Sequence, residues 1–354
     1  METKKYRFDE VTINFDKKRI PLSSAQREKR QGTFRYYGAQ GVIDHVDDYI
    51  YDGTYLLIAE DGENLKSKKQ NIAQVVDGQF WVNNHAHIVQ GNEQCDTRFL
   101  CYLINSMDLS GYVTGSAQPK LSQANLNAIT LSLPTLVEQK RIVEYLYMLD
   151  QKIDVNRQIN DNLEQQAQAI YSYMFIENAD PAWVQGHLSD LITVKYGKDH
   201  KKLADGSYPV YGSGGIMRYV ERPLYDKESV LIPRKGTLNN VMYVNQPFWS
   251  VDTMFYTEMR LPNVAKFVYH FVKAKDLASM NAGSAVPSMT TDILNAMEVV
   301  IPSTSALAEF ESLVDPMYRA MQENNIQSSK LSELRDALLP KLMSGEIDVS
   351  DIQL

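Results

Sequence analysis

Few residues in this sequence have the types and spacing of a catalytic or metal site. Glu138-Gln139-Lys140 has a nuclease-like Glu-x-Lys spacing, but Thr135-Leu136-Val137-Glu138 is also a helix-capping box, which gives Glu138 a structural role. His85 and His87 are one residue apart, and neither a nearby cysteine nor a third histidine accompanies them, so structural histidines fit better than zinc ligands. We therefore predict no catalytic residue and no metal site.

Sequence motifs for the common cofactors are also missing. There is no Gly-x-x-x-x-Gly-Lys-Ser/Thr loop for ATP, no Gly-x-Gly fingerprint for S-adenosylmethionine, and no Asn/Asp-Pro-Pro-aromatic stretch for adenine methylation. An enzyme that acts alone on nucleic acid is therefore a poor fit, and binding is the chemistry that remains.

Side chains suited to nucleic-acid contacts occur in several short clusters. Lysine and arginine contact phosphates, and glutamine pairs with adenine edges. Residues 1–35 alone hold ten basic and five acidic residues. A charge cluster is more often a solvated surface, the tyrosines fit core packing equally well, and the two small-residue loops fit plain turns. The candidates for DNA contact are Arg27, Lys29, Arg30, Arg35, Tyr37, Lys66, Lys68, Lys69, Ser116, Gln118, Lys120, Lys198, Lys201, Lys202, Tyr211, Arg234, Lys235, Ser284 and Ser288.

An internal repeat organises the chain. Tyr37-Gly38-Ala39-Gln40-Gly41 recurs 174 residues later as Tyr211-Gly212-Ser213-Gly214-Gly215. Gly115-Ser116-Ala117-Gln118-Pro119 recurs 168 residues later as Gly283-Ser284-Ala285-Val286-Pro287. The matches are collinear and need a single six-residue adjustment. We interpret the chain as two diverged copies of one unit, in which short strands, turns and a helix (97–108 and 264–276) precede a long terminal helix.

The terminal segments of both copies have apolar residues in alternating steps of four and three, which is the heptad pattern of paired helices. Polar residues lie near the middle of each pattern, so antiparallel pairing would bring them together. Two separate amphipathic helices, each on its own domain, are the alternative. Pro316 predicts a late start or a kink in the second helix. The predicted seam consists of Ile142, Leu146, Leu149, Ile153, Asn156, Asn160, Leu163, Leu313, Met317, Asn324, Gln327, Leu331, Leu334 and Leu338.

Composition bounds the class of protein. The 354 residues are 44% hydrophobic and 23% charged, which is typical of a globular chain, and no apolar run suits a membrane span or a signal peptide. Two cysteines cannot form a disulfide framework, so we expect a cytoplasmic protein. The net charge of −8 is concentrated in residues 135–180 (4 basic, 8 acidic) and 303–354 (4 basic, 9 acidic), so the bulk acidity does not exclude a DNA-binding face elsewhere.

Several of these motifs resemble the specificity (S) subunits of type I restriction-modification systems. The resemblance rests on 134–143 (PTLVEQKRIV) with 149–153 (LDQKI), on 115–121 (GSAQPKL), and on 37–44 (YGAQGVID) with 51–57 (YDGTYLL). It spans nearly the whole chain, including the duplication. The second helix departs from the pattern because Glu309 is followed by Phe310, which indicates a three-residue insertion at its start.

This resemblance implies an α+β fold with two globular target recognition domains, each followed by a long helix, and an antiparallel coiled coil of the two helices. The expected boundaries are 1–134 and 181–302 for the recognition domains, and 135–180 and 303–354 for the helical spacers.

The resemblance further implies a non-catalytic subunit that reads a bipartite target in double-stranded DNA. Its partners would be two methyltransferase (M) and two restriction (R) subunits, with no membrane association. No cofactor would be bound by this chain, since S-adenosylmethionine, ATP and Mg belong to the partner subunits. The alternative that we keep open is a two-headed coiled-coil adaptor that binds proteins without DNA specificity.

Overall fold

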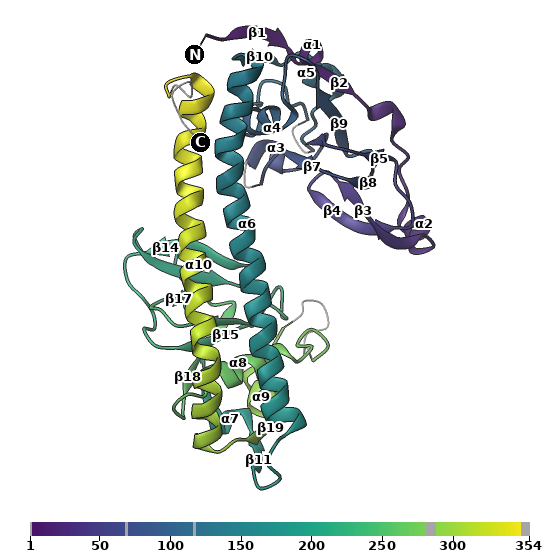
Figure 1. The fold of residues 1–354 in the computed structure, drawn as a ribbon. Coiled ribbons are helices and arrows are strands. Elements are labelled where there is room, and N and C mark those ends of the chain that lie inside the picture. Colours follow the sequence, from purple (N-terminus) through teal and green to yellow (C-terminus); the bar gives the residue numbers. More distant parts are fainter. Residues whose placement is uncertain (1, 68–69, 116–117, 281–287, 348–354) are drawn as a thin grey trace. The chain divides into compact units, whose positions relative to one another are not determined.

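The computed structural model describes residues 2–67, 70–115, 118–280 and 288–347 (Figure 1). The chain divides into two compact units, one of residues 1–155 with 326–354 and the other of 156–325. Each unit combines one mixed α/β globular domain with one half of each of two long helices. This confirms the predicted α+β class. In the described part of the chain, no helix combines the length and the apolarity needed to cross a lipid bilayer.

The globular domain of the first unit contains two four-stranded sheets, in the orders β2-β9-β6-β7 and β4-β3-β8-β5, and a two-stranded β1-β10 sheet. All five residues of the central strand β6 are buried, because it has a neighbour on each side and the helix α4 packs over it. The elements are β1 (Lys4–Arg7), α1 (Phe8–Val11), β2 (Thr12–Asn14), η1 (Asp16–Lys18), α2 (Ser24–Glu28), β3 (Gln31–Gly38), β4 (Gly41–Val46), β5 (Tyr51–Asp52), β6 (Tyr55–Ala59), α3 (Asn64–Ser67), β7 (Ala73–Val76), β8 (Gln79–Val82), β9 (Ala86–Gly91), α4 (Thr97–Ser106), α5 (Gln123–Asn127) and β10 (Thr130–Leu133).

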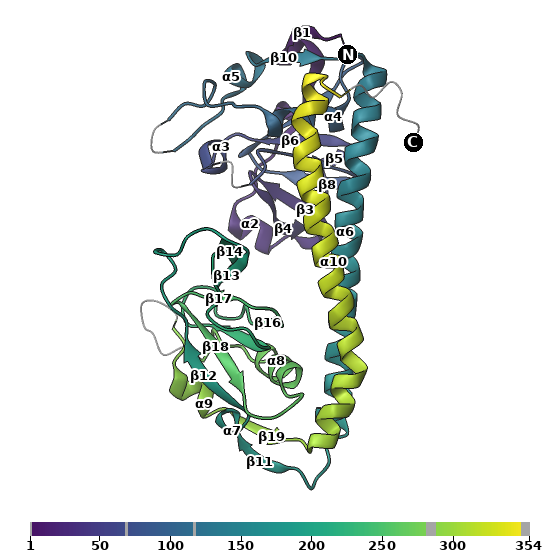
Figure 2. The ribbon, with the colours of Figure 1, turned by 90° about the vertical axis from the view of Figure 1, so that its left-hand side faces the viewer.

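The globular domain of the second unit repeats this plan. Its sheets have the orders β12-β18-β15-β16, β14-β13-β17 and β11-β19, which match those of the first unit strand for strand except that no described strand corresponds to β5. The helix α8 contacts β15 and β16 and also reaches the long helices (Figure 2). The elements are β11 (Val184–His187), α7 (Leu188–Leu191), β12 (Ile192–Tyr196), β13 (Tyr208–Gly212), β14 (Gly215–Val220), β15 (Ser229–Pro233), β16 (Met242–Val244), β17 (Trp249–Ser250), β18 (Met254–Met259), α8 (Ala265–Lys273), α9 (Thr291–Asn295) and β19 (Glu298–Ile301).

The two long helices are α6 (Leu136–Ser172), which continues into the π-helical turn η2 (Tyr173–Glu177), and α10 (Thr304–Ser344). The predicted capping box begins α6, since the carboxylate of Glu138 accepts from the backbone N–H of Thr135 at 2.8 Å and the Thr135 hydroxyl accepts from the N–H of Glu138. The helix α10 runs through Pro316, so the predicted late start is wrong. It begins 168 residues after α6, as β19 follows β10 by 168, so the expected insertion is also wrong: Leu307, not Phe310, takes the place of Gln139.

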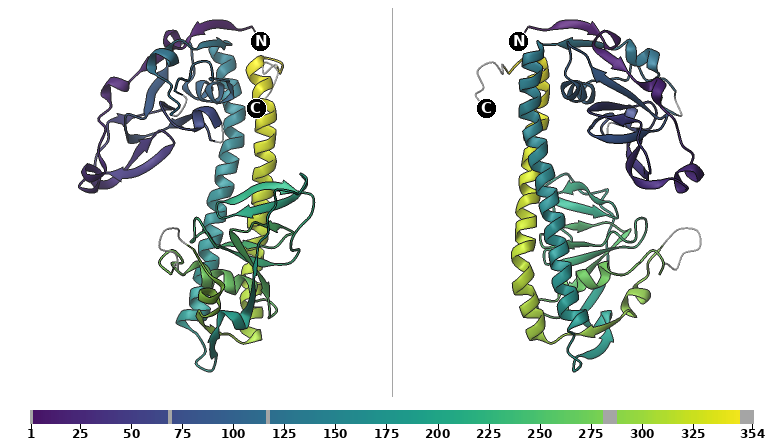
Figure 3. Two further views of the ribbon diagram at one scale, coloured as in Figure 1. Left: turned by 180° about the vertical axis from the view of Figure 1, so that it is seen from behind. Right: turned by 45° about the vertical axis from the view of Figure 1, so that its right-hand side comes forward.

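Within each unit the helix halves pair in antiparallel orientation (Figure 3). In the first unit the guanidinium of Arg335 contacts the Asp150 carboxylate at 2.7 Å, and Ile142 shares a core with Leu342. In the second unit the amide of Asn324 donates to the Asn160 side-chain oxygen at 2.9 Å, and the Asn156 amide donates to the Asn324 carbonyl oxygen at 3.3 Å. The predicted antiparallel pair and its central polar contacts are therefore confirmed.

The predicted seam of α10 is correct at only one of the two positions in each heptad. Met317, Asn324, Leu331 and Leu338 are partly buried, but Leu313 and Leu334 are 47% and 45% exposed, and Gln327 is exposed. The inward positions are instead one residue later, where Val314 and Met321 pack against the core and Arg335 binds Asp150. Every predicted seam residue of α6 is buried or half-buried: Ile142, Leu146, Leu149, Ile153, Asn156, Asn160 and Leu163.

Candidate nucleic-acid interface

Three repeated motifs of the sequence meet at one edge of the first domain. The backbone N–H of Gly62 donates to the Pro119 carbonyl at 3.3 Å, and Asp61 and Lys120 form an isolated β-bridge. The turn between β3 and β4 joins them, since a Cβ on Gly62 would lie 3.4 Å from the side-chain nitrogen of Gln40. We call this set, residues 38–41, 60–62, 114–115 and 118–120, the first loop edge.

An equivalent edge exists in the second domain. Met289 N–H donates to the Arg234 carbonyl at 2.9 Å, and Lys235 and Ser288 form the matching β-bridge. The Asn240 amide donates to the Ser213 carbonyl at 2.7 Å, which holds the β13–β14 turn beside the segment after β15. Residues 212–215, 234–236 and 288 form the second loop edge. Motifs that are far apart in sequence therefore converge in the same way in both copies.

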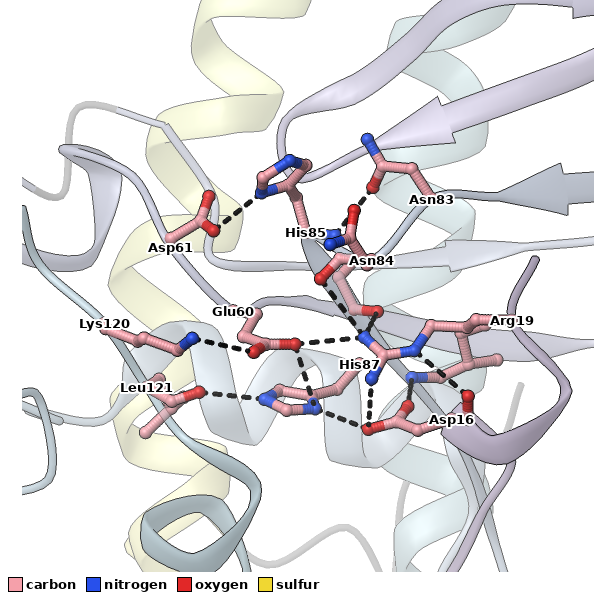
Figure 4. A network of polar contacts seen from close by, with 12 residues as sticks. Asp16, Arg19, Glu60, Asp61, Asn83, Asn84, His85, His87, Lys120 and Leu121 are labelled. Atoms are coloured by element: carbon pink, nitrogen blue, oxygen red, sulfur yellow. Dashed lines mark hydrogen bonds and ion pairs between the residues drawn. The ribbon is translucent and has the colours of Figure 1, made fainter. Parts of the chain in front are cut away.

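A buried ionic network supports the first loop edge (Figure 4). His87 on β9 is 1% exposed, and its Nδ1 lies 2.6 Å from the Asp16 carboxylate. Its Nε2 lies 2.8 Å from the carbonyl oxygen of Leu121, directly after the last residue of the loop. Arg19 binds Asp16 and also Glu60, at 3.5 and 3.0 Å, and Glu60 binds Lys120 at 3.3 Å. The network thus ties three segments of the chain to this edge.

The partners of His87 require it to be a cation. A backbone carbonyl is an acceptor only, so Nε2 must donate; a carboxylate is also an acceptor, so Nδ1 must donate as well. Burial raises the pKa of Asp16, but hydrogen bonds from His87 and from the Ile88 N–H outweigh it and hold that pKa below its ordinary value. Burial lowers the pKa of His87, but its bonds to Asp16 and Leu121 outweigh this and raise it. The imidazolium form is therefore favoured.

The second domain replaces this ionic anchor with rings. The register of β12 against β18 puts Tyr196 and Phe255 where the first domain has Asp16 and His87, and their ring centroids are 5.1 Å apart at an interplanar angle of 67°. Arg234, the counterpart of Glu60, lies over the Tyr196 ring at 5.3 Å. The two copies therefore present edges of different charge on one scaffold.

The structure divides the sequence candidates into three groups. Exposed side chains at or next to the loop edges are available to a ligand; these are Gln118, Lys120, Lys198, Lys201, Lys202 and Lys235, with Ser288 half-buried and Lys66 bound to the Gly115 carbonyl. Others are tied to the fold: Arg27 binds Asp44, Arg30 binds Asp47, Arg35 donates to the Asp77 carbonyl, and Arg234 stacks on Tyr196, whereas Lys29 is exposed on the segment after α2. Lys68, Lys69, Ser116 and Ser284 lie outside the described residues.

Two tyrosine candidates belong to the core. Tyr37 is 4% exposed and packs edge-to-face on Phe80, so a role in DNA contact is wrong for it. Tyr211 is half-buried against Phe248, and its hydroxyl accepts a bond from Gln246 at 3.3 Å. The structural alternative for Trp81 is confirmed, since this residue is buried and its indole donates to the Ile20 carbonyl at 2.6 Å.

The described residues contain no group of three or more His, Cys, Asp or Glu side chains placed to hold a metal ion. The amide of Gln139 in the Glu-x-Lys string is buried, where it donates to the carbonyls of Gln94 and Pro134 and accepts from the Asp96 N–H. Gln139 therefore fastens the start of α6 to the domain. Sequence reasoning missed Asp16, Arg19 and Glu60, although His87 was noticed; no local pattern links residues 71 positions apart.

Comparison with known proteins follows the same division into two copies. The family described as "Type I restriction modification DNA specificity domain" matches residues 2–165 and again 182–324. A putative type I restriction enzyme specificity subunit of Haemophilus influenzae is 26% identical, with 94% of this chain and 93% of that protein covered. The MjaIX specificity subunit of Methanocaldococcus jannaschii is 22% identical, with 72% and 70% covered. Among solved structures, the S subunit of a type I restriction-modification system from M. genitalium has a TM-score of 0.64 at 16% identity, with 97% and 96% covered.

Proposed function

Because the chain belongs to the family of type I restriction-modification DNA specificity proteins, we propose that it is the non-catalytic subunit that selects a bipartite target in double-stranded DNA. Each globular domain reads one half-site through its loop edge. The paired helices set the gap between the half-sites.

The observation that carries this proposal is the convergence of the repeated motifs at one loop edge in each copy. Exposed lysines at or next to these edges suit phosphate contacts, and Gln118 suits a base edge. The edges differ in charge, since Asp61 of the first domain stands where the second has Lys235. Two edges with different chemistry fit two different half-sites.

The partners in this proposal are two methyltransferase and two restriction subunits, which dock through the helices. S-adenosylmethionine, ATP and Mg act in those subunits, and this chain binds none of them. Flipping and methylation of the target adenine are then acts of the partner, at a place that this chain selects.

The test is a methyladenine map of the source genome with and without this chain. We expect methylation to disappear from one split motif, two short sequences around a fixed gap. The complex with the methyltransferase subunit should bind a duplex carrying that motif and discriminate against a duplex whose gap is lengthened by two base pairs. Equal binding of both duplexes would overturn the two-reader proposal, and binding insensitive to any DNA would favour a protein adaptor.

A further inference from the structure

The hairpin at each loop edge contains a β-bulge at the same place. In the first domain Tyr37 pairs with Val42 and Tyr36 pairs with Asp44, so Ile43 is the extra residue. In the second domain Tyr211 pairs with Ile216 and Val210 with Arg218, which makes Met217 the extra residue. A bulge re-aims a side chain out of the regular alternation and is a built feature of a sheet.

Glycines accommodate the bulged side chains. A Cβ on Gly38 would lie 3.2 Å from a methyl carbon of Ile43, and one on Gly212 would lie 2.5 Å from the sulfur of Met217. Each bulged side chain therefore lies across the glycine that begins the turn. This explains why the sequence Tyr-Gly-x-x-Gly recurs with two large apolar residues directly after it.

These apolar residues are exposed in both copies. Ile43 is 53% and Met217 60% exposed, and their neighbours Val42 and Ile216 are 44% and 49% exposed. The identities have diverged between the copies, but the size, the apolar character and the exposure are retained. Side chains with half of their surface in water contribute little to the core, so the folding of the domain does not account for this retention.

The position of the hairpins indicates the occupant. Each turn lies against a loop edge, Gln40 beside Gly62 and Ser213 beside Gly236, where Lys120 and Lys235 are exposed. A two-stranded ribbon fits the major groove of B-DNA, and apolar side chains there contact the C5-methyl group of thymine. Basic groups beside an apolar ribbon suit a duplex, whose phosphates flank the groove.

We infer that the two hairpins enter the major groove and that Ile43 and Met217, with Val42 and Ile216, read thymine methyl groups, one half-site for each domain. This inference rests on the proposed function and adds to it the element and the side chains that read bases. Shape and chemistry differ between the two bulged residues, so the two hairpins are suited to different arrangements of methyl groups.

The experiment uses the full chain in complex with its methyltransferase subunit and a synthetic duplex of the mapped motif. Each thymine of the two half-sites is replaced in turn by deoxyuridine, which lacks only the C5-methyl group, and affinity is measured by competition at fixed salt. We expect at least one replacement in each half-site to weaken wild-type binding by about three- to five-fold, the size of one buried methyl contact. Ile43→Ser should weaken binding and abolish the deoxyuridine effect in one half-site only, and Met217→Ser in the other.

Control variants separate a contact from a general defect. Ile43→Leu and Met217→Leu should retain the deoxyuridine effect, and Val184→Ser, which changes a 68% exposed valine on β11, should behave as wild type. If wild type discriminates the motif from a scrambled duplex but no deoxyuridine weakens it, or if both serine variants keep the wild-type pattern, the inference is wrong while the proposed function stands. If wild type does not discriminate the motif at all, the proposed function itself fails.

Discussion

His87 and Leu121 are joined by a hydrogen bond of 2.8 Å from the imidazole Nε2 to the backbone carbonyl oxygen, while the other ring nitrogen lies 2.6 Å from Asp16. Because both partners accept, a single protonated ring holds the end of the 114–120 loop to the sheet. Arg19 and Glu60 also face this ring, and Lys120 reaches it through Glu60. The loop edge of the first domain therefore depends on the charge state of one buried histidine.

We expect the stability of the first unit to depend on pH through His87. Its pKa is raised in the folded state, so its contribution is fully present below the unfolded value near 6.5 and is lost as the pH rises through the folded value. The pKa of Asp16 is lowered, so its contribution is present above about 3.9 and is lost as the pH falls through the folded value. Urea unfolding between pH 5 and 9 should show the decline on the alkaline side.

Variants of this pair should give distinct results. His87→Ala should cost about 3–5 kcal/mol, because it leaves a buried carboxylate without its partner. The double variant Asp16→Tyr with His87→Phe copies the ring pair of the second domain and should recover much of this loss while removing the alkaline decline. A pH profile of the double variant that still matches wild type would rule out His87 as the origin.

The sequence predicts the parts of the fold that depend on local periodicity. The helices expected at 97–108 and 264–276 are present as α4 and α8, and the alternating steps of four and three in residues 138–175 correspond to α6. The pairing of the helices also follows, because Asn160 and Asn324 interrupt otherwise apolar patterns and must meet. Each of these features depends on spacings of a few residues.

The sequence does not predict which of two neighbouring residues faces inward. Leu313 and Val314 are both apolar, so α10 fits a heptad in either frame. Arg335 occupies an inward position that a pattern search assigns to the surface, and its bond to Asp150 comes from the other helix. The ionic network at His87 and the bulges at Ile43 and Met217 are equally hidden, since they depend on contacts and strand register that no local spacing records.

The frame of α10 is testable with neighbouring substitutions. Val314→Ser should lower the free energy of unfolding by about 2–4 kcal/mol, because it empties a buried position and places a hydroxyl there. Leu313→Ser should change it by less than about 0.5 kcal/mol, since that side chain is exposed. Thermal or urea unfolding of the two variants is the measurement, and equal losses would contradict the frame.

The asparagine contacts between the helices should trade stability for register. Asn160 donates to the Asn325 side-chain oxygen at 2.9 Å and accepts from Asn324 at 2.9 Å. Polar seam residues fix the alignment of paired helices at a cost in stability. We expect the double variant Asn160→Leu with Asn324→Leu to resist urea better than wild type, by about 1 kcal/mol. Its complex should discriminate less sharply between duplexes of different gap length, and a sharper or unchanged preference would contradict a register role.

Lys235 should contribute to DNA affinity through a phosphate. It is exposed on the second loop edge, and no bond to a described side chain holds it. A lysine that neutralises one phosphate releases about one counterion, so Lys235→Ala should weaken binding and reduce the slope of log affinity against log salt by about 1. Binding titrations of the methyltransferase complex between 50 and 200 mM salt, a range in which such effects are large, measure this slope. Lys152→Ala, which removes an exposed lysine from α6 away from both loop edges, is the matched control and should leave the slope unchanged. A wild-type slope in the Lys235 variant would mean that the second loop edge contacts DNA without this side chain.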